Sequence, residues 1–242
     1  MVDRKIIGFD RKIQLEWLDL VADWASQGIP HPTIRDELYS VLADQVLGDA
    51  KGGARSKTVT VLTRIWLNVP KHLVEFRDEG LGIFRGISSK ERKLLHLGMT
   101  MANYRFVFDV LTQIGRLANL QDEFSTAQID RRIIENWGNT QRVSRSVRHV
   151  IQSLRLWMIL RQTNSRGYYK TELQVIVKSK KLKKWLAQAF LLSYCKPASI
   201  DTITNHPSLF FMKLELNTRD LAKTKNFEIT NHSLGDRSIS LR

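Results

Sequence analysis

The hydrophobic positions in the first third of the chain recur at the three- and four-residue intervals of amphipathic helices. Asp10 is placed to cap the first of these segments, and Gly28 with Pro30 is expected to end it. The predicted helices span 10–28, 33–48 and 59–70, in a helical N-terminal domain of residues 1–87 whose junction lies at Gly86 and Ile87.

A long helical tract is predicted after this junction. Ser88 and, three residues later, Glu91 have the spacing of the reciprocal capping pair that marks a helix start. Apolar residues then keep helical spacing from 94 to 120. Gly98 and the aromatic residues at 104–108 are the places where we expect this tract to divide.

Two helices joined by a glycine turn are predicted next. Ser125 and Gln128 form a second capping pair, and Gly138 stands where a helix C-terminus favours a left-handed residue. The second helix begins at Thr140 or Gln141. Its apolar stripe consists of Val143, Val147, Val150, Ile151, Leu154 and Met158.

The pattern then changes from helical to extended. The runs 156–163 and 168–171 flank the turn-forming residues 164–167, which favours a β-hairpin with Arg166 at its tip. A helix, a short turn, a basic helix and a basic hairpin in this order indicate a winged helix-turn-helix. We assign it to a central domain of residues 88–178.

A basic run opens the last part of the chain. Lys178 to Lys184 leads into a further predicted helix, and strands are predicted at 209–216, 227–230 and 238–241. The last two strands flank a turn that contains Asn231 and Gly235. We therefore expect a mainly α-helical protein whose residues 179–242 comprise the basic helix and a small α+β unit.

The positive charge of the chain is concentrated in one region. The 242 residues include 38 Lys and Arg and 24 Asp and Glu, which gives a net charge of +14. Residues 131–185 hold fourteen of the basic residues and only two Glu, so the rest of the chain carries +2. Such a local field favours a polyanionic partner, and the alternative is a solubilising surface.

The polar face of the basic helix suits duplex DNA, because a helix fits the major groove and Arg and Ser side chains reach phosphates and base edges. A solvated amphipathic surface is the alternative for this helix. The lysine run at 178–184 is either a second phosphate contact or a solvated edge. The candidate DNA-binding residues are Arg142, Ser144, Arg145, Arg148, His149, Gln152, Arg155, Arg166, Lys170, Lys180, Lys181, Lys183 and Lys184.

The sequence contains no convincing catalytic or metal-binding motif. The six histidines show no H-x-x-x-H spacing, and the tract 52–58 breaks the phosphate-loop pattern at both glycine positions. Acidic residues that would hold Mg²⁺ for a nuclease are sparse near the basic region. Cys195 lies in an apolar run, where we expect a buried and inert thiol. We expect no enzyme activity, no metal and no cofactor.

A single cysteine excludes an internal disulfide framework and a zinc site built on paired thiolates. The apolar run 185–195 is much shorter than the roughly 20 residues that cross a bilayer. The first residues show no apolar segment of signal-peptide length. A reducing, cytoplasmic environment is therefore the expected location.

The stretch 94–160 resembles the BrxA family of the BREX bacteriophage-exclusion systems. The shared pattern is an aromatic-rich helix with Tyr104 and Phe106, a helix start at Ser125, a tryptophan-bearing stretch, a basic helix and a closing Ile159–Leu160 pair. The resemblance implies a mainly helical, non-enzymatic DNA-binding protein with a winged helix. It also implies that the arginines of the basic helix and Arg166 meet DNA.

These observations predict a non-enzymatic protein that binds double-stranded DNA with low sequence specificity, as a component of a prokaryotic anti-phage defence system. Two alternatives remain. The first is a protein-docking scaffold of a defence complex, whose N-terminal half with Trp17, Trp24 and Trp66 binds a larger enzyme. The second is an RNA-binding protein, because phosphate attraction alone does not distinguish DNA from RNA.

Overall fold

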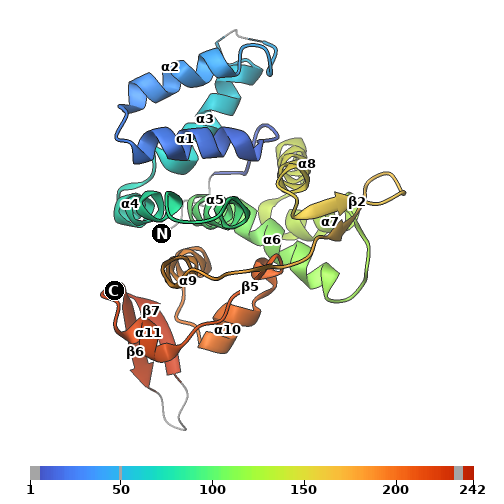
Figure 1. Ribbon diagram of the computed structural model, residues 1–242. Helices are drawn as coiled ribbons and strands as arrows, with labels where there is room; N and C mark the ends of the chain where they lie inside the picture. Colours follow the sequence, from blue (N-terminus) through green and yellow to red (C-terminus); the bar gives the residue numbers. More distant parts are fainter. Residues whose placement is uncertain (1–5, 49–50, 232–236) are drawn as a thin grey trace.

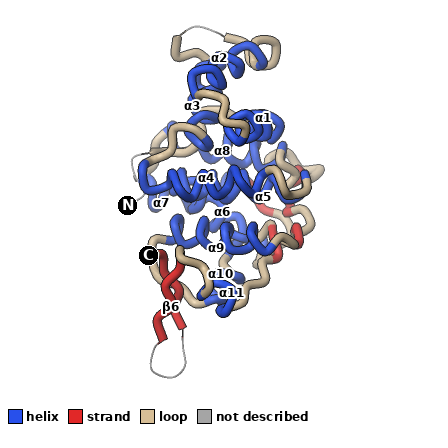
Figure 2. The backbone as a smooth tube through the Cα atoms, turned by 60° about the vertical axis from the view of Figure 1, so that its left-hand side comes forward, coloured by secondary structure: helices blue, strands red, loops and turns tan. Residues whose placement is uncertain are grey.

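A computed structural model describes residues 6–48, 51–231 and 237–242. The described chain is mainly helical, with small sheets toward its C-terminus, as the sequence predicts. The helices form stacked layers: the first helices lie at the top of Figure 1, a middle layer crosses the molecule, and the C-terminal elements lie below it. Figure 2 shows the same order of layers from another side.

The upper layer contains α1 (Leu15–Ser26), α2 (His31–Val41) and α3 (Ala54–Trp66). The predicted start of the first helix at Asp10 is wrong. Residues 10–13 are not helical, because the Ile13 amide donates to Ser153 Oγ (2.9 Å) and its carbonyl accepts from Trp157 Nε1 (2.9 Å). The second helix also ends at Val41 rather than near Gly48.

The middle layer contains η1 (Lys71–Leu73), α4 (Val74–Phe84), α5 (Ser89–Asn103) and α6 (Arg105–Ala118). The sequence analysis missed α4. The predicted long tract divides at Tyr104, whose extended backbone separates α5 from α6. Gly98 is not a break. It lies inside α5, where an added Cβ would fall 2.5 Å from the Trp185 ring.

The Ser88–Glu91 capping pair is incomplete. Ser88 occupies the N-cap position of α5, but its side chain accepts no hydrogen bond from the helix. The Glu91 carboxylate accepts from the Ser88 hydroxyl (3.2 Å) and also from the backbone amides of Lys178 (3.1 Å) and Ser179 (3.3 Å). These bonds hold the pKa of Glu91 below its usual value although burial acts in the opposite direction. Glu91 therefore bonds the N-cap residue of its own helix and also joins two layers.

The central segment consists of β1 (Phe124–Ser125), α7 (Thr126–Trp137), α8 (Gln141–Leu156), β2 (Leu160–Gln162) and β3 (Tyr168–Thr171). Both reciprocal bonds of the Ser125–Gln128 capping box are present. The three strands form one antiparallel sheet in the order β1-β3-β2. Met158 leaves the predicted apolar stripe, because α8 ends before it and its side chain is 65% exposed.

The lower layer contains β4 (Val175–Ile176), α9 (Lys180–Tyr194), α10 (Ile200–Asn205), η2 (Pro207–Leu209), β5 (Met212–Lys213), α11 (Thr218–Ala222), β6 (Phe227–Asn231) and β7 (Arg237–Leu241). The hairpin of β6 and β7 agrees with the prediction. The predicted turn residue Gly235 lies outside the described residues. The long strand predicted at 209–216 is wrong: only β5 forms, parallel to β4.

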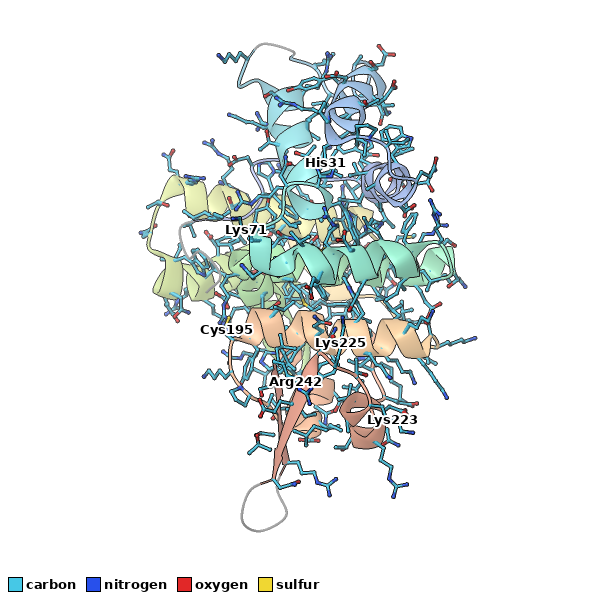
Figure 3. All side chains as sticks on the ribbon, turned by 90° about the vertical axis from the view of Figure 1, so that its left-hand side faces the viewer. His31, Lys71, Cys195, Lys223, Lys225 and Arg242 are labelled. Carbon is cyan, nitrogen blue, oxygen red and sulfur yellow. The ribbon has the colours of Figure 1, made fainter. Side chains whose placement is uncertain are left out.

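Helices α4 and α9 run antiparallel across the interface between the middle and lower layers. Figure 3 places Lys71, before α4, and Cys195, after α9, at the same side of the molecule. Trp185 of α9 stacks on Phe76 of α4 at 4.2 Å and donates to its carbonyl (2.8 Å). One continuous cluster of buried apolar side chains runs through all the layers. The domain boundaries at residues 87 and 178 stay a prediction.

Candidate nucleic-acid interface

Helix α8 separates its side chains cleanly into two faces. Val143, Val147, Val150, Ile151 and Leu154 are buried against the core. The opposite face carries the exposed row, which we define as Arg142, Arg145, Arg148, Gln152 and Arg155. At 1.5 Å per residue the row is about 20 Å long. The side chains of this row therefore reach solvent along one side of α8.

The four arginines of the exposed row lack carboxylate partners in the part of the chain that the structure describes, where no Asp or Glu lies within ion-pair distance of any of them. Arg155 donates from Nη1 to Gln162 Oε1 (3.1 Å), which links the end of α8 to β2. Uncompensated guanidinium groups spaced along a helix create a positive potential that attracts phosphates.

The buried side of α8 is fixed by the N-terminal segment 8–13. The Ser153 hydroxyl accepts from the Ile13 amide and donates to the His149 carbonyl (2.8 Å). The Trp157 indole, just after α8, donates to the Ile13 carbonyl and lies against Phe9 at 6.4 Å. Segment 8–13, which is far from α8 in the sequence, thus holds the buried side of this helix in place.

His149 differs from the other candidates on α8. Both of its ring nitrogens are buried and have no hydrogen-bond partner among the described residues. Burial chiefly lowers its pKa, and Arg11, Arg145 and Arg148 lower it further. A neutral imidazole with covered nitrogens offers no direct contact to a phosphate. Ser144, by contrast, is half-buried at the edge of the exposed row.

The turn between β2 and β3 projects from the side of the molecule, at the right edge of Figure 1. The Thr163 amide donates to the Tyr168 carbonyl (3.0 Å), and the Gly167 carbonyl accepts from Thr126 at the start of α7 (3.0 Å). Gly167 has a φ of +82°, a conformation that glycine adopts without strain. Arg166 is exposed at this tip.

The sheet carries a second pair of basic residues. Arg161 of β2 and Lys170 of β3 are cross-strand neighbours, so their side chains share one face. Lys170 forms an ion pair with Glu123 (3.0 Å), and Arg161 is exposed. The charge of the candidate Lys170 is therefore neutralised by Glu123. Arg161, which was not among the candidates, is more exposed than Lys170 and forms no ion pair with a described residue.

The candidate lysines of α9 do not join the exposed row. In Figures 1 and 2, α8 lies above the middle layer and α9 below it. Lys180 and Lys181 are exposed in the first turn of α9, Lys184 is half-buried, and Lys183 approaches Glu215 at 3.8 Å. The candidates therefore fall into two separate groups.

No cluster of His, Cys, Asp and Glu in the described parts of the chain has the geometry of a metal site. Among the same residues, no helix is long and apolar enough to span a membrane. The expectation of a buried Cys195 is wrong: its thiol is free and exposed, because the residue follows α9 in a left-handed conformation.

Two features of this surface escaped the sequence analysis. The first is the role of segment 8–13, which depends on contacts across about 140 positions of sequence. The second is β1, which has only two residues and is too short for a periodic pattern to show.

No family model, no curated protein and no solved structure matches the chain.

Proposed function

We propose that α6 through β3 form a winged helix that binds double-stranded DNA. The order helix, strand, helix, helix, strand, strand with a sheet of order β1-β3-β2 is that of a helix-turn-helix followed by a wing. In this arrangement α8 enters the major groove and the β2–β3 turn contacts a neighbouring groove. The exposed row on α8, which has no carboxylate partner among the described residues, is the observation that carries the proposal.

Charge explains why affinity comes mainly from phosphates. The row presents four guanidinium groups and one amide, and Arg161 and Arg166 extend the positive surface onto the wing. Arginines bind phosphate oxygens and guanine edges, whereas discrimination among all base pairs needs a mixed set of donors and acceptors. Weak sequence preference follows from this composition. The resemblance to the BrxA family is the support for a role in phage defence.

Removal of two central arginines tests the surface. We expect Arg145→Ala/Arg148→Ala to weaken binding to a labelled DNA duplex by at least about tenfold at 150 mM salt, measured by fluorescence anisotropy. The free energy of unfolding should change by less than about 1 kcal/mol, because both side chains are exposed. Circular dichroism melting checks this.

The matched control is Lys223→Ala/Lys225→Ala, which removes the same charge from two exposed residues near the C-terminal end, labelled in Figure 3. It should reduce affinity much less than the arginine variant. Equal losses in the two variants would show that only net charge matters, and the α8 surface would then be rejected.

The same assay separates the competing functions. No binding of the wild-type protein to DNA at 150 mM salt would overturn the proposal and favour a protein-docking scaffold. Competition by structured RNA at concentrations well below those of duplex DNA would favour RNA, because A-form helices present a wide minor groove and 2′-hydroxyls. Preferential competition by duplex DNA is the expected result.

A further inference from the structure

A cleft of about 510 Å³ lies beside α6, outside the exposed row of α8. Its floor is the polar face of α6, where Arg105, Asp109, Thr112 and Arg116 recur at helical spacing. Its walls come from the end of α7, the end of α9 and the residue before η2. The volume falls within the roughly 300–1,000 Å³ of small-molecule sites.

One ion pair in the cleft is already satisfied. Arg105 donates from Nε to Asp109 Oδ1 (3.1 Å) and also donates to the Ser193 carbonyl near the end of α9. Asp109 Oδ2 accepts from the Trp137 indole (3.0 Å). These contacts join α6, α7 and α9. Arg105 and Asp109 thus connect the floor of the cleft to its walls and cancel each other's charge.

Two further cations in the cleft have no such partner among the described residues. Arg116 and Lys196 are both exposed, and in the described ranges no carboxylate lies within ion-pair distance of either. The Lys196 ammonium lies 5.5 Å from the centre of the Tyr194 ring. The cleft therefore has an uncompensated charge of about two positive units, held on side chains that solvent can reach.

His206 supplies a neutral donor in the same cleft. Its Nδ1 accepts from the Ser208 amide (3.2 Å), so the proton of the neutral ring resides on Nε2. Burial, with the charges of Arg116 and Arg105, lowers its pKa to about 4. The ring stacks on Phe108 at 5.5 Å, which fixes its orientation.

We propose that this cleft binds a small phosphate monoester carried on a flat ring, of which a nucleoside monophosphate is the representative. Arg116 and Lys196 bind the phosphate, His206 Nε2 donates a further hydrogen bond, and the ring packs against Trp137 and Tyr194. A phosphate monoester carries about −1.5 to −2 charges at pH 7, which matches the two free cations better than a carboxylate does. No residue of the exposed row of α8 lines this site.

Calorimetric titration of the full chain with adenosine 5′-monophosphate tests the site. Arg116→Ala/Lys196→Ala should weaken binding by at least about tenfold, because two charge-assisted contacts are lost. Inorganic phosphate should bind more weakly than the nucleotide, and adenosine should not bind detectably. The control is Arg145→Ala/Arg148→Ala, which should bind the nucleotide as the wild type does.

An NMR titration of the His206 ring gives a second readout. The charged groups that line the cleft with it are Arg105, Asp109, Arg116 and Lys196. A bound phosphate opposes the arginine charges, so the pKa of His206 should rise on binding. Unchanged nucleotide affinity in the Arg116/Lys196 variant, loss of affinity in the α8 variant, or no binding at millimolar nucleotide would overturn the proposal. None of these outcomes bears on DNA binding by the wild type.

Discussion

At the scale of single residues, His96 illustrates how this fold pairs its buried polar groups. The side chain is fully buried in α5. Its Nδ1 accepts from the Trp66 indole (2.9 Å), so Nε2 carries the proton that bonds Asp19 Oδ1 (3.0 Å). A neutral His96 therefore links α5 to α3 and α1. The position of His96 in the sequence alone does not indicate that Trp66 and Asp19 are its partners.

The same environment predicts the pH dependence of stability. Burial lowers the pKa of His96, and Asp19 only partly opposes that effect. The unfolded chain then binds more protons than the native one, so the free energy of unfolding should fall as the pH drops below about 6.5, the ordinary histidine value. Urea unfolding at a series of pH values measures this.

His96→Leu serves as the control for that series. This variant should be less stable at pH 7, because the buried Trp66 indole loses its acceptor. Its stability should also depend less on pH between 7 and 5. An identical slope in the wild type and the variant would show that His96 does not contribute. His72, His149 and His206, whose pKa values are also lowered, contribute to the remaining slope.

At the scale of elements, the sequence correctly predicted the features whose hydrogen bonds join residues close together along the chain. The capping box at Ser125 and the β2–β3 hairpin follow the sequence because their bonds lie within a few residues. Helix α4 was missed although Leu73, Phe76 and Phe84 have helical spacing, since its two glycines weaken helix propensity. Gly80 is buried there against Trp185 of another helix.

Helix α6 shows how closely two elements approach. A Cβ added at Gly115 would lie 1.9 Å from the Pro207 carbonyl oxygen, which is backbone and does not yield easily. We expect Gly115→Ala to lower the free energy of unfolding by about 1–3 kcal/mol, because η2 must move away. Thermal and denaturant unfolding measure the loss.

Gly82→Ala is the matched control for this substitution. Gly82 also lies inside a helix, and nothing would come within 4 Å of its added Cβ. Alanine there should stabilise the protein by roughly 0.5–1 kcal/mol through helix propensity. A stabilising effect at Gly115 as well would contradict the close packing of α6 on η2.

At the scale of the whole molecule, the charge is divided between two layers. The exposed row of α8 and the lysines of α9 lie on opposite sides of the middle layer. The sequence analysis grouped all thirteen candidates as DNA-binding residues, with a solvated edge as the alternative for the lysine run, because spacing along the chain carries no information about layers. It predicted the arginine row correctly as a set on one helix face, since that spacing is local.

This division predicts the salt dependence of DNA binding. Helix α8 and the wing together offer six exposed arginines. If about five of them contact phosphates, log K should fall with log salt at a slope of about −4 to −5. Participation of the α9 lysines in the same complex would steepen the slope by about 0.9 for each. Anisotropy titrations between 50 and 300 mM salt measure it, and a slope near −1 would contradict a phosphate-dominated interface.

The link between Ile13 and α8 constrains the order in which the chain can fold. Its partners, Ser153 and Trp157, lie 140 and 144 positions later. During translation, the peptide groups of Ile13 cannot find these partners until well over half of the 242 residues have left the ribosome. Closing such a long loop is slow, because the chain loses conformational entropy before the non-local contacts form and stabilise it. Segment 8–13 therefore cannot make its contacts to α8 and Trp157 until that helix has emerged.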